Sequence, residues 1–269
     1  MATSLTVAAR HSYEWSGQGV DITKVDRQLS SLWKQLAKES ETGWPVRTHV
    51  SNLVVHTESW SEVQRIAVGL KKLASRHPSR AIILIPDRAD ERSSIDAELT
   101  VECPPGAAGL PSLYYECIVL TIDGRAADHL SSVVIPLLMP DLPTYLWWPG
   151  PPPFGHRALH RLLSVADQLV IDSAEFSWPG DGYADLARLC SGKQGVNYFN
   201  WAWLSAWREI IAQFFDGAVL APYASVIHSV QVEIGAGGEN YARPTAGVLL
   251  LVGWPHASVG SLKRRWTVS

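Results

Sequence analysis

The sequence predicts an α/β protein in two parts, with mixed sheets flanked by helices. Segments with the apolar, β-branched character of strands alternate with segments whose apolar residues recur at helical spacing. The continuous apolar run Arg80–Pro86 is typical of a strand buried on both faces of a sheet. The alternation starts again after the proline-rich loop 149–153. We therefore expect an N-terminal α/β domain over residues 1–150 and a C-terminal α/β domain over residues 151–269.

Helix and strand signals follow one another in the N-terminal part. Apolar residues at helical spacing predict a helix over 25–37, and β-branched residues predict a strand over 48–56. Ser59 followed by Glu62 forms a capping-box pattern at the start of a second helix. The elements expected after it are strands at 80–86, 97–103, 113–122 and 144–148, and a helix at 126–138 that Pro136 interrupts late.

The C-terminal part repeats the pattern with shorter elements. The expected helices cover 157–165, 183–190 and 203–215, and an apolar, helical run covers 245–254. The expected strands cover 168–172 and 225–234. Because strands and helices alternate, some of the strands should pair in parallel.

Composition excludes several classes of protein. Hydrophobic residues make up 46% of the 269 residues and the net charge is −3, so the chain is not intrinsically disordered. The 23 basic and 26 acidic side chains are evenly spread, which argues against a nucleic-acid partner. The most apolar stretch, 135–154, holds seven prolines and cannot form a membrane-spanning helix, so we expect no membrane partner.

The cysteines and the N-terminus indicate the compartment. Cys103, Cys117 and Cys190 are odd in number and widely spaced, which favours three reduced, mostly buried thiols. The first ten residues lack the basic and apolar regions of a signal peptide. We expect a cytoplasmic protein.

Motifs for catalysis are missing from the sequence. It contains no P-loop, no GxSxG elbow and no HExxH, and it ties no histidine to a nucleophile, so we name no catalytic residue and no cofactor. His156 and His160 are four residues apart, as two metal ligands on one helix face would be. No third ligand is evident near them, and we expect no metal site.

Two segments leave open an alternative function, that of an enzyme or binding protein acting on a sugar phosphate. Asp172 and Ser173 follow a predicted strand, where α/β proteins often bind ligands, although such a pair is also a common turn or cap. Gly235, Gly237 and Gly238 follow another strand and could hold a phosphate on their backbone N–H groups, although a flexible turn fits them as well.

Tryptophan is the unusual feature of the composition, with twelve residues in the chain. Trp147 and Trp148 run directly into the proline-rich loop, where Pro149, Pro151 and Pro152 restrict the backbone. Adjacent strand residues face opposite ways, so at most one of the two tryptophans can point to a given core. A pre-ordered aromatic loop is suited to docking a partner protein.

A second group of tryptophans lies in the predicted helix over 203–215. Trp203 and Trp207 are four residues apart and share a helix face, and Arg208 follows Trp207. Three interpretations remain open for the tryptophans: a large aromatic core, a recognition surface for a protein, or an aromatic platform for sugars. As a hypothesis, we place Trp207 and Arg208 with the loop tryptophans in a partner-binding surface.

Six segments occur in order and are followed by a late apolar run: RTHVSNLVV (47–55), RHPSRAIILIPD (76–87), YECIVL (115–120), IPLLMPDLPTYLWWPGPPP (135–153), ADQLVIDSAEF (166–176), NWAWLSAWREIIAQFFD (200–216) and GVLLLVGW (247–254). Together they resemble the OpcA family of glucose-6-phosphate dehydrogenase assembly proteins. The resemblance covers about residues 47–254, and its most specific part is the unusual proline- and tryptophan-rich segment.

The resemblance implies a non-catalytic partner of glucose-6-phosphate dehydrogenase in the oxidative pentose phosphate pathway. Members of the family are described as assembling that enzyme or raising its activity through its oligomeric state. Family members commonly continue past the GW segment with further strands, so the C-terminal domain is expected to be shortened here, with Pro255 interrupting its last helix. No regulatory cysteine pair of the family maps onto the three cysteines of this chain.

Overall fold

The computed structural model describes residues 12–39, 47–74, 76–88, 93–102, 114–176, 179–190, 195–226, 229–232, 246–258 and 265–268. The chain forms two compact units. The first unit holds residues 1–149 and 153–169, and the second holds residues 150–152 and 170–269. The predicted domain boundary after residue 150 stays a prediction.

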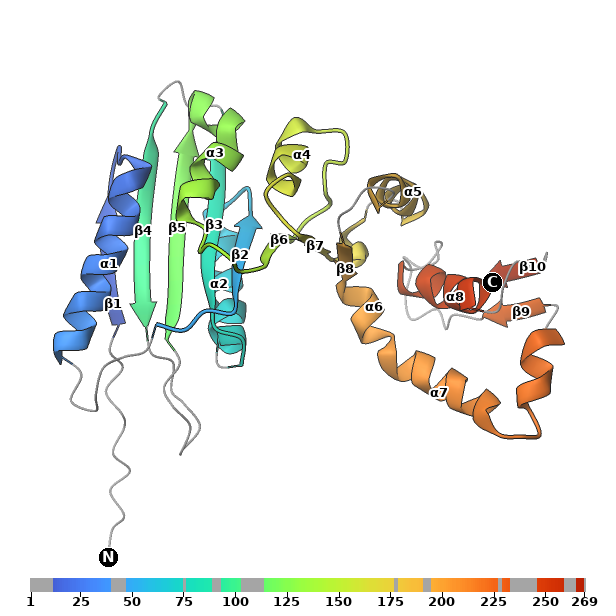
Figure 1. The fold of residues 1–269 in the computed structure, drawn as a ribbon. Coiled ribbons are helices and arrows are strands. Elements are labelled where there is room, and N and C mark those ends of the chain that lie inside the picture. Colours follow the sequence, from blue (N-terminus) through green and yellow to red (C-terminus); the bar gives the residue numbers. More distant parts are fainter. Residues whose placement is uncertain are drawn as a thin grey trace, which may run out of the picture. The chain divides into compact units, whose positions relative to one another are not determined.

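A mixed sheet forms the centre of the first unit (Figure 1). Its strands are β1 (Ser12–Gly17), β2 (Ser51–His56), β3 (Ser79–Asp87), β4 (Ile95–Glu102), β5 (Tyr115–Asp123) and β6 (Thr144–Trp148). They lie in the order β1-β4-β5-β3-β2-β6, and β7 (Gln168–Ile171), which carries the boundary between the units, follows β6. The pairs β5-β3, β3-β2 and β2-β6 are parallel, whereas β4 is antiparallel to both β1 and β5. The predicted α/β class is confirmed, although the sequence analysis missed β1.

The order of the parallel strands has a consequence for ligand binding. The chain passes from β2 to β3 and β5 on one side and later returns to β6 on the other side of β2. In parallel α/β sheets, the carboxyl ends of the two strands flanking such a reversal open a crevice. Here these are the ends of β2 and β6.

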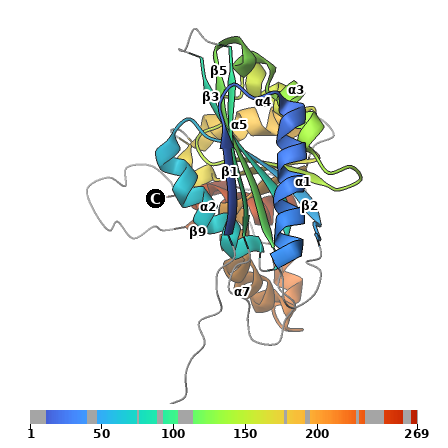
Figure 2. The same cartoon turned by 90° about the vertical axis from the view of Figure 1, so that its left-hand side faces the viewer.

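Helices cover both faces of this sheet, with α1 (Ile22–Glu39) and α2 (Trp60–Ala74) on opposite faces (Figure 2). The apolar stripe of α2 packs on alternate residues of β2 and β3, which point to one face because strand side chains alternate. α4 (Arg157–Leu163) also belongs to the first unit. The core under α2 consists of Leu53, Val55, Val63, Ile66, Leu70, Ala74, Ala81, Ile83, Ile85, Tyr115 and Cys117.

Two local expectations in this unit differ from the structure. The predicted helix over 126–138 is a 3₁₀ helix at 124–129, a single α-helical turn α3 (Leu130–Val134) and a second 3₁₀ turn at 135–137. The interruption expected at Pro136 is present, because this residue has no N–H to continue the α-helical ladder. At the start of α2, the Glu62 carboxylate accepts a hydrogen bond from the Thr57 hydroxyl, while the Ser59 hydroxyl contacts that of Ser61. The capping box expected from Ser59 and Glu62 is therefore replaced by a bond to the strand end.

The described residues of the second unit are mainly helical. Its elements are α5 (Pro179–Cys190), β8 (Gly195–Tyr198), α6 (Phe199–Trp203), α7 (Ser205–Asp216), β9 (Ser229–Val232), α8 (Ala246–Ser258) and β10 (Arg265–Val268). The strands β9 and β10 pair in parallel, and α8 packs on α6 and β9. The helix predicted over 203–215 is divided at Leu204, and a 3₁₀ helix at 221–226 replaces the first part of the strand predicted over 225–234. Helix α8 continues past Pro255, so the expected interruption is wrong.

Candidate functional site

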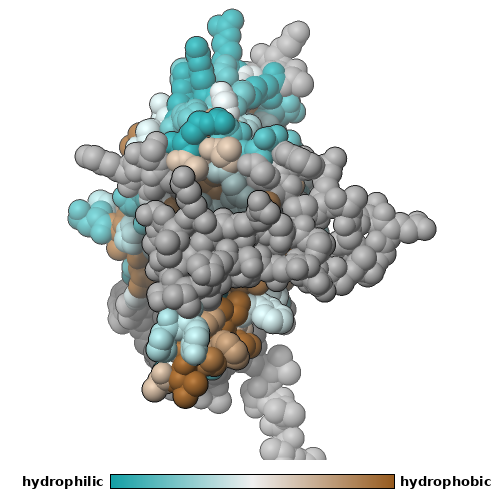
Figure 3. Space-filling view, turned by 90° about the vertical axis from the view of Figure 1, so that its right-hand side faces the viewer, coloured by the Kyte–Doolittle hydropathy of each residue, from teal (hydrophilic) through white to brown (hydrophobic). Residues whose placement is uncertain are grey.

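The helices α6 and α7 present an apolar stripe to solvent in the second unit. Trp207, Ile210 and Phe214 are three and four residues apart on α7, so they follow one helix face, and Trp203 is the last residue of α6. Their exposed fractions are 81%, 60%, 60% and 62%. Figure 3 shows hydrophobic side chains gathered low on the face it presents, at the height where α7 lies in Figure 1. We call these four residues the α7 face; they leave a large area of apolar side chain in water, which marks interaction sites in soluble proteins.

Arg208 fixes the corner between α6 and α7. Its guanidinium lies 3.6 Å from the centroid of the Trp201 ring, and its NH1 donates to the Trp201 carbonyl at 2.6 Å. Its NH2 also donates to the Ser205 hydroxyl at 3.1 Å. Arg208 therefore stabilises the geometry that exposes Trp207, and its role as a direct partner contact stays a prediction.

The two tryptophans of β6 face opposite sides of the sheet. Trp148 is 5% exposed, and its ring stacks on that of His56 with centroids 3.8 Å apart and planes 9° apart. Trp147 is half-buried and packs against the core under α2. In the following loop, Pro149 is half-buried, Pro151 is exposed and Pro152 is buried. The structure thus uses both tryptophans in packing, and their role with the loop in binding a partner stays a prediction.

The residues of the alternative ligand site make local contacts in the second unit. The Asp172 carboxylate accepts a hydrogen bond from the Ala174 N–H at 2.9 Å, as a cap does. Ser173 is fully buried, and its hydroxyl accepts from the Tyr183 hydroxyl at 2.9 Å and from the Asn200 amide at 3.0 Å. Gly235, Gly237 and Gly238 lie outside the described residues.

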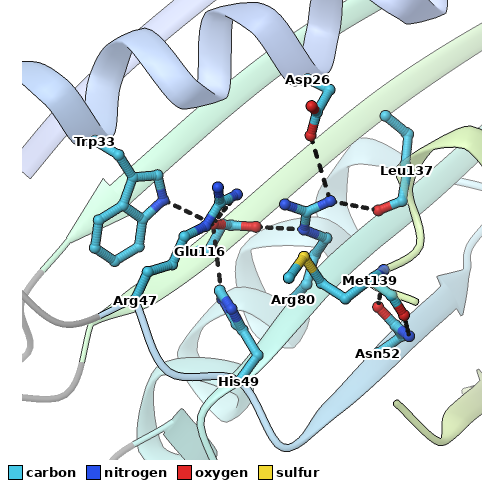
Figure 4. Close-up of polar contacts among 9 residues, drawn as sticks. All are labelled: Asp26, Trp33, Arg47, His49, Asn52, Arg80, Glu116, Leu137 and Met139. Atoms are coloured by element: carbon cyan, nitrogen blue, oxygen red, sulfur yellow. Dashed lines mark hydrogen bonds and ion pairs between the residues drawn. The ribbon is translucent and has the colours of Figure 1, made fainter. Parts of the chain in front are cut away.

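A buried ionic cluster lies at the amino ends of the parallel strands (Figure 4). Glu116 of β5 is 0% exposed, and its carboxylate accepts hydrogen bonds from Trp33 Nε1 at 2.7 Å and from Arg47 Nε at 3.0 Å. Arg80 of β3 pairs with Glu116 Oε1. His49 Nε2 lies 3.6 Å from Glu116 Oε2, the oxygen that Trp33 and Arg47 also contact. Four groups from three further parts of the chain thus converge on one carboxylate.

Arg80 extends this cluster. Its side chain is 3% exposed, and its NH1 donates to the Leu137 carbonyl at 2.6 Å and lies 3.5 Å from Asp26. Burial opposes the charged form of Glu116, but Arg80, Arg47, His49 and Trp33 outweigh it and hold the pKa of Glu116 below its ordinary value. The cluster joins α1, β3, β5 and the segment that precedes β2. Its role is therefore structural.

This cluster was not predicted from the sequence. Glu116 interrupts the apolar strand segment YECIVL, and a charge inside a buried strand requires a partner. That signal indicates a buried ion pair, but it does not say which of the 23 basic residues supplies the partner.

His56 creates a pH dependence of stability. Burial, followed by electrostatic repulsion from the neighbouring Arg88 and His156 side chains, lowers the pKa of His56 to about 4 from its ordinary 6.5. Below pH 6.5 the unfolded chain binds a proton at His56 more readily than the folded protein does. The free energy of unfolding is therefore highest above pH 6.5 and decreases as the pH falls towards 4. The expected loss is about 3 kcal/mol of unfolding free energy, as the shift in pKa requires.

Urea unfolding at several pH values should show a flatter profile for His56→Gln than for the wild type. The exposed His77→Gln should keep the wild-type profile, and equal profiles for all three proteins would contradict the assignment.

Other chemistry has little support in the described parts of the chain. Among them, no group of three or more His, Cys, Asp or Glu side chains is placed to hold a metal ion. No helix within the described ranges has the length and apolar character needed to cross a bilayer. Cys117 is buried with a free thiol, as expected, and burial raises its pKa to about 11, so it stays protonated. Cys103 and the side chain of Cys190 lie outside what the structure describes.

The fold defines a mixed-sheet α/β protein whose second unit exposes an aromatic helix face. Residues 70–188 match the model of a family described as the glucose-6-phosphate dehydrogenase subunit N-terminal domain. The OxPP cycle protein OpcA of Synechocystis sp. is 29% identical over 184 residues, which are 68% of this chain and 37% of that protein. The protein of the same name from Nostoc punctiforme is 25% identical over 68% of this chain and 38% of its own length. The one from Synechococcus elongatus is 30% identical over 56% of this chain and 34% of its own length. The matching part of the chain is similar to the OpcA family, and the resemblance found in its segments is confirmed. Its matching part spans little more than a third of these relatives.

Proposed function

We propose that this protein is a non-catalytic factor that binds glucose-6-phosphate dehydrogenase and favours its active oligomer or conformation in the oxidative pentose phosphate pathway. The description of the matching family names that enzyme, and the relatives are named for the OxPP cycle. The proposal carries this association over to the chain, and it includes a cytoplasmic location beside that enzyme.

The α7 face is the observation that carries the proposal. Two of its four members are tryptophans, the residue type most enriched among the dominant contacts of protein interfaces. Covering such a surface removes apolar area from water and favours association. We place the main contact with the dehydrogenase at the α7 face, with Trp147, Trp148 and the loop 149–153 as a secondary candidate. Trp148 is almost fully buried, and this favours the α7 face.

The activating effect follows from linkage. A partner that binds the active form of the enzyme more tightly than the inactive form shifts the population towards the active form. A difference of about 1.4 kcal/mol in binding free energy changes that equilibrium about tenfold. Because coupling is reciprocal, substrate should also tighten the complex if the effect is on substrate affinity.

Trp207→Ala is expected to weaken binding to the cognate dehydrogenase at least about tenfold, since truncating a central tryptophan of an interface typically costs about 2 kcal/mol or more. Sizing chromatography with light scattering measures the complex. Enzyme assays across glucose 6-phosphate concentrations measure activation in the same mixtures. Trp60→Ala, which removes a tryptophan that is 46% exposed on α2, is the matched control and should bind as the wild type does.

Two outcomes would contradict the proposal at different levels. Equal binding by Trp207→Ala and wild type would remove the α7 face as the contact. A wild-type protein that neither binds the dehydrogenase nor changes its kinetics would overturn the function itself.

A further inference from the structure

The crevice at the carboxyl ends of the parallel strands has the features of a ligand site. Its walls include His56 at the end of β2, Pro86 near the end of β3 and Trp148 at the end of β6. It therefore lies where the strand order reverses, between β2 and β6, which is the usual position of a ligand in this architecture. A cavity of about 320 Å³ there adjoins a second one of about 500 Å³, and the two share Arg88, His156 and Ala158. All of these residues belong to the first unit.

Arginines outnumber carboxylates across these two cavities. Arg88, Arg157 and Arg161 line them, against the carboxylates Glu58 and Asp128. Arg88 Nε lies 3.5 Å from the Asp128 carboxylate, but both side chains are largely exposed, and pairs of this kind interact weakly. Arg161 donates to the backbone carbonyl of Asp128. Because a carbonyl is neutral, this contact does not neutralise the charge of Arg161. The crevice is therefore suited to an anion.

Arg88 and His156 form a pair of donors. His156 Nδ1 accepts a hydrogen bond from the Ala158 N–H at 3.2 Å, so the proton of the neutral ring is on Nε2. Arg88 NH1 lies 3.3 Å from that Nε2, and a guanidinium can only donate. Two donors at this distance do not satisfy each other, whereas one anionic oxygen beside them can accept from both.

The stacked rings of His56 and Trp148 form the other wall. The rings stack at 3.8 Å and are 6% and 5% exposed, so a small part of each borders the cavity beside the charged side chains. A cavity of about 320 Å³ is at the small end of the range for small-molecule sites. We propose that this crevice binds a small phosphorylated molecule, with the phosphate group on Arg88 and His156 and the organic part towards His56 and Trp148.

Calorimetric titration of the full chain, without the dehydrogenase, tests the proposal independently of the proposed function. The probes are glucose 6-phosphate, inorganic phosphate and uncharged glucose, each to about 10 mM, which reaches the weakest affinities of interest. Glucose 6-phosphate should bind and glucose should not. Arg88→Gln should weaken binding at least about tenfold, because it removes a charge-assisted hydrogen bond. Arg65→Gln, at a largely exposed arginine on α2, should leave binding unchanged.

The comparison of the two phosphates shows which wall contributes. Tighter binding of glucose 6-phosphate than of inorganic phosphate supports recognition of the organic part as well, and equal binding supports recognition of the phosphate group alone. Arg88→Lys, which keeps the charge, should bind more tightly than Arg88→Gln, and melting curves establish that each variant is folded. The proposal is overturned if neither phosphate binds the wild type, if glucose binds as well as glucose 6-phosphate, or if Arg88→Gln binds as the wild type does.

Discussion

Replacing Glu116 with glutamine is expected to lower the free energy of unfolding by about 3–5 kcal/mol, the cost of breaking a buried ion pair by removing one partner. The carboxylate is 0% exposed and the Arg80 side chain 3% exposed, so the variant leaves a buried guanidinium without its anion. Arg80 cannot lose its proton to relieve this cost. Its remaining acceptors are the Leu137 carbonyl and the half-exposed Asp26.

Denaturant unfolding at neutral pH measures this change. Glu98→Gln, at an exposed position on the neighbouring strand β4, is the matched control and should change stability by less than about 0.5 kcal/mol. Adding Arg80→Met to Glu116→Gln should cost less than the two single changes together, because the second change removes the uncompensated charge. A loss in Glu116→Gln as small as that in Glu98→Gln would show that the cluster does not hold the elements together.

The same cluster predicts a loss of stability in acid. Because the pKa of Glu116 lies below its ordinary value of 4.5, its stabilisation is complete above that pH and is lost as the pH falls through the lowered pKa. Wild-type stability should fall in this acidic range more steeply than that of Glu116→Gln. The loss assigned to His56 occurs at higher pH, which separates the two effects.

Trp148→Ala is expected to destabilise the protein by about 3–5 kcal/mol, the usual cost of truncating a buried tryptophan. The side chain is 5% exposed, and the stacked His56 ring would lose the surface it packs on. Neighbouring side chains cannot fill a space of that size, so the crevice at the carboxyl end of β6 is enlarged at the expense of packing.

Circular dichroism with thermal unfolding, run beside a binding measurement, decides the role of Trp148. Trp203→Ala, at a tryptophan that is 81% exposed, is the control and should leave the melting temperature near that of the wild type. Lost folding in Trp148→Ala assigns the residue to the core. Intact stability with lost binding to the dehydrogenase would contradict that assignment and favour a surface role.

Strong local patterns predicted most of the elements correctly. The stripe of Val25, Leu29, Leu32, Trp33 and Leu36 identified α1, and the run Arg80–Pro86 identified β3, because burial on one helix face or on both sheet faces leaves a clear periodicity. The strand β1 was missed because SYEWSG carries little apolar signal, and its place is determined by pairing with β4.

The candidate sites were harder to predict than the elements. The spacing of Trp203 and Trp207 showed that they share a face, but their exposure depends on what packs against α6 and α7. The phosphate crevice was missed because Arg88, Trp148 and His156 come from different elements, and only the strand order brings them together. Periodicity carries no information about such long-range neighbours.

By itself, the sequence determined the α/β class, most of the helices and strands, and the resemblance to the OpcA family, because each of these follows from local patterns or from ordered segments. Only the tertiary structure decided that Glu116 meets Arg47 and Arg80, and that Trp148 stacks on His56. The physical reason is that burial and ion pairing depend on distances between residues far apart in the chain. Those distances exist only after the strands have taken their order in the sheet.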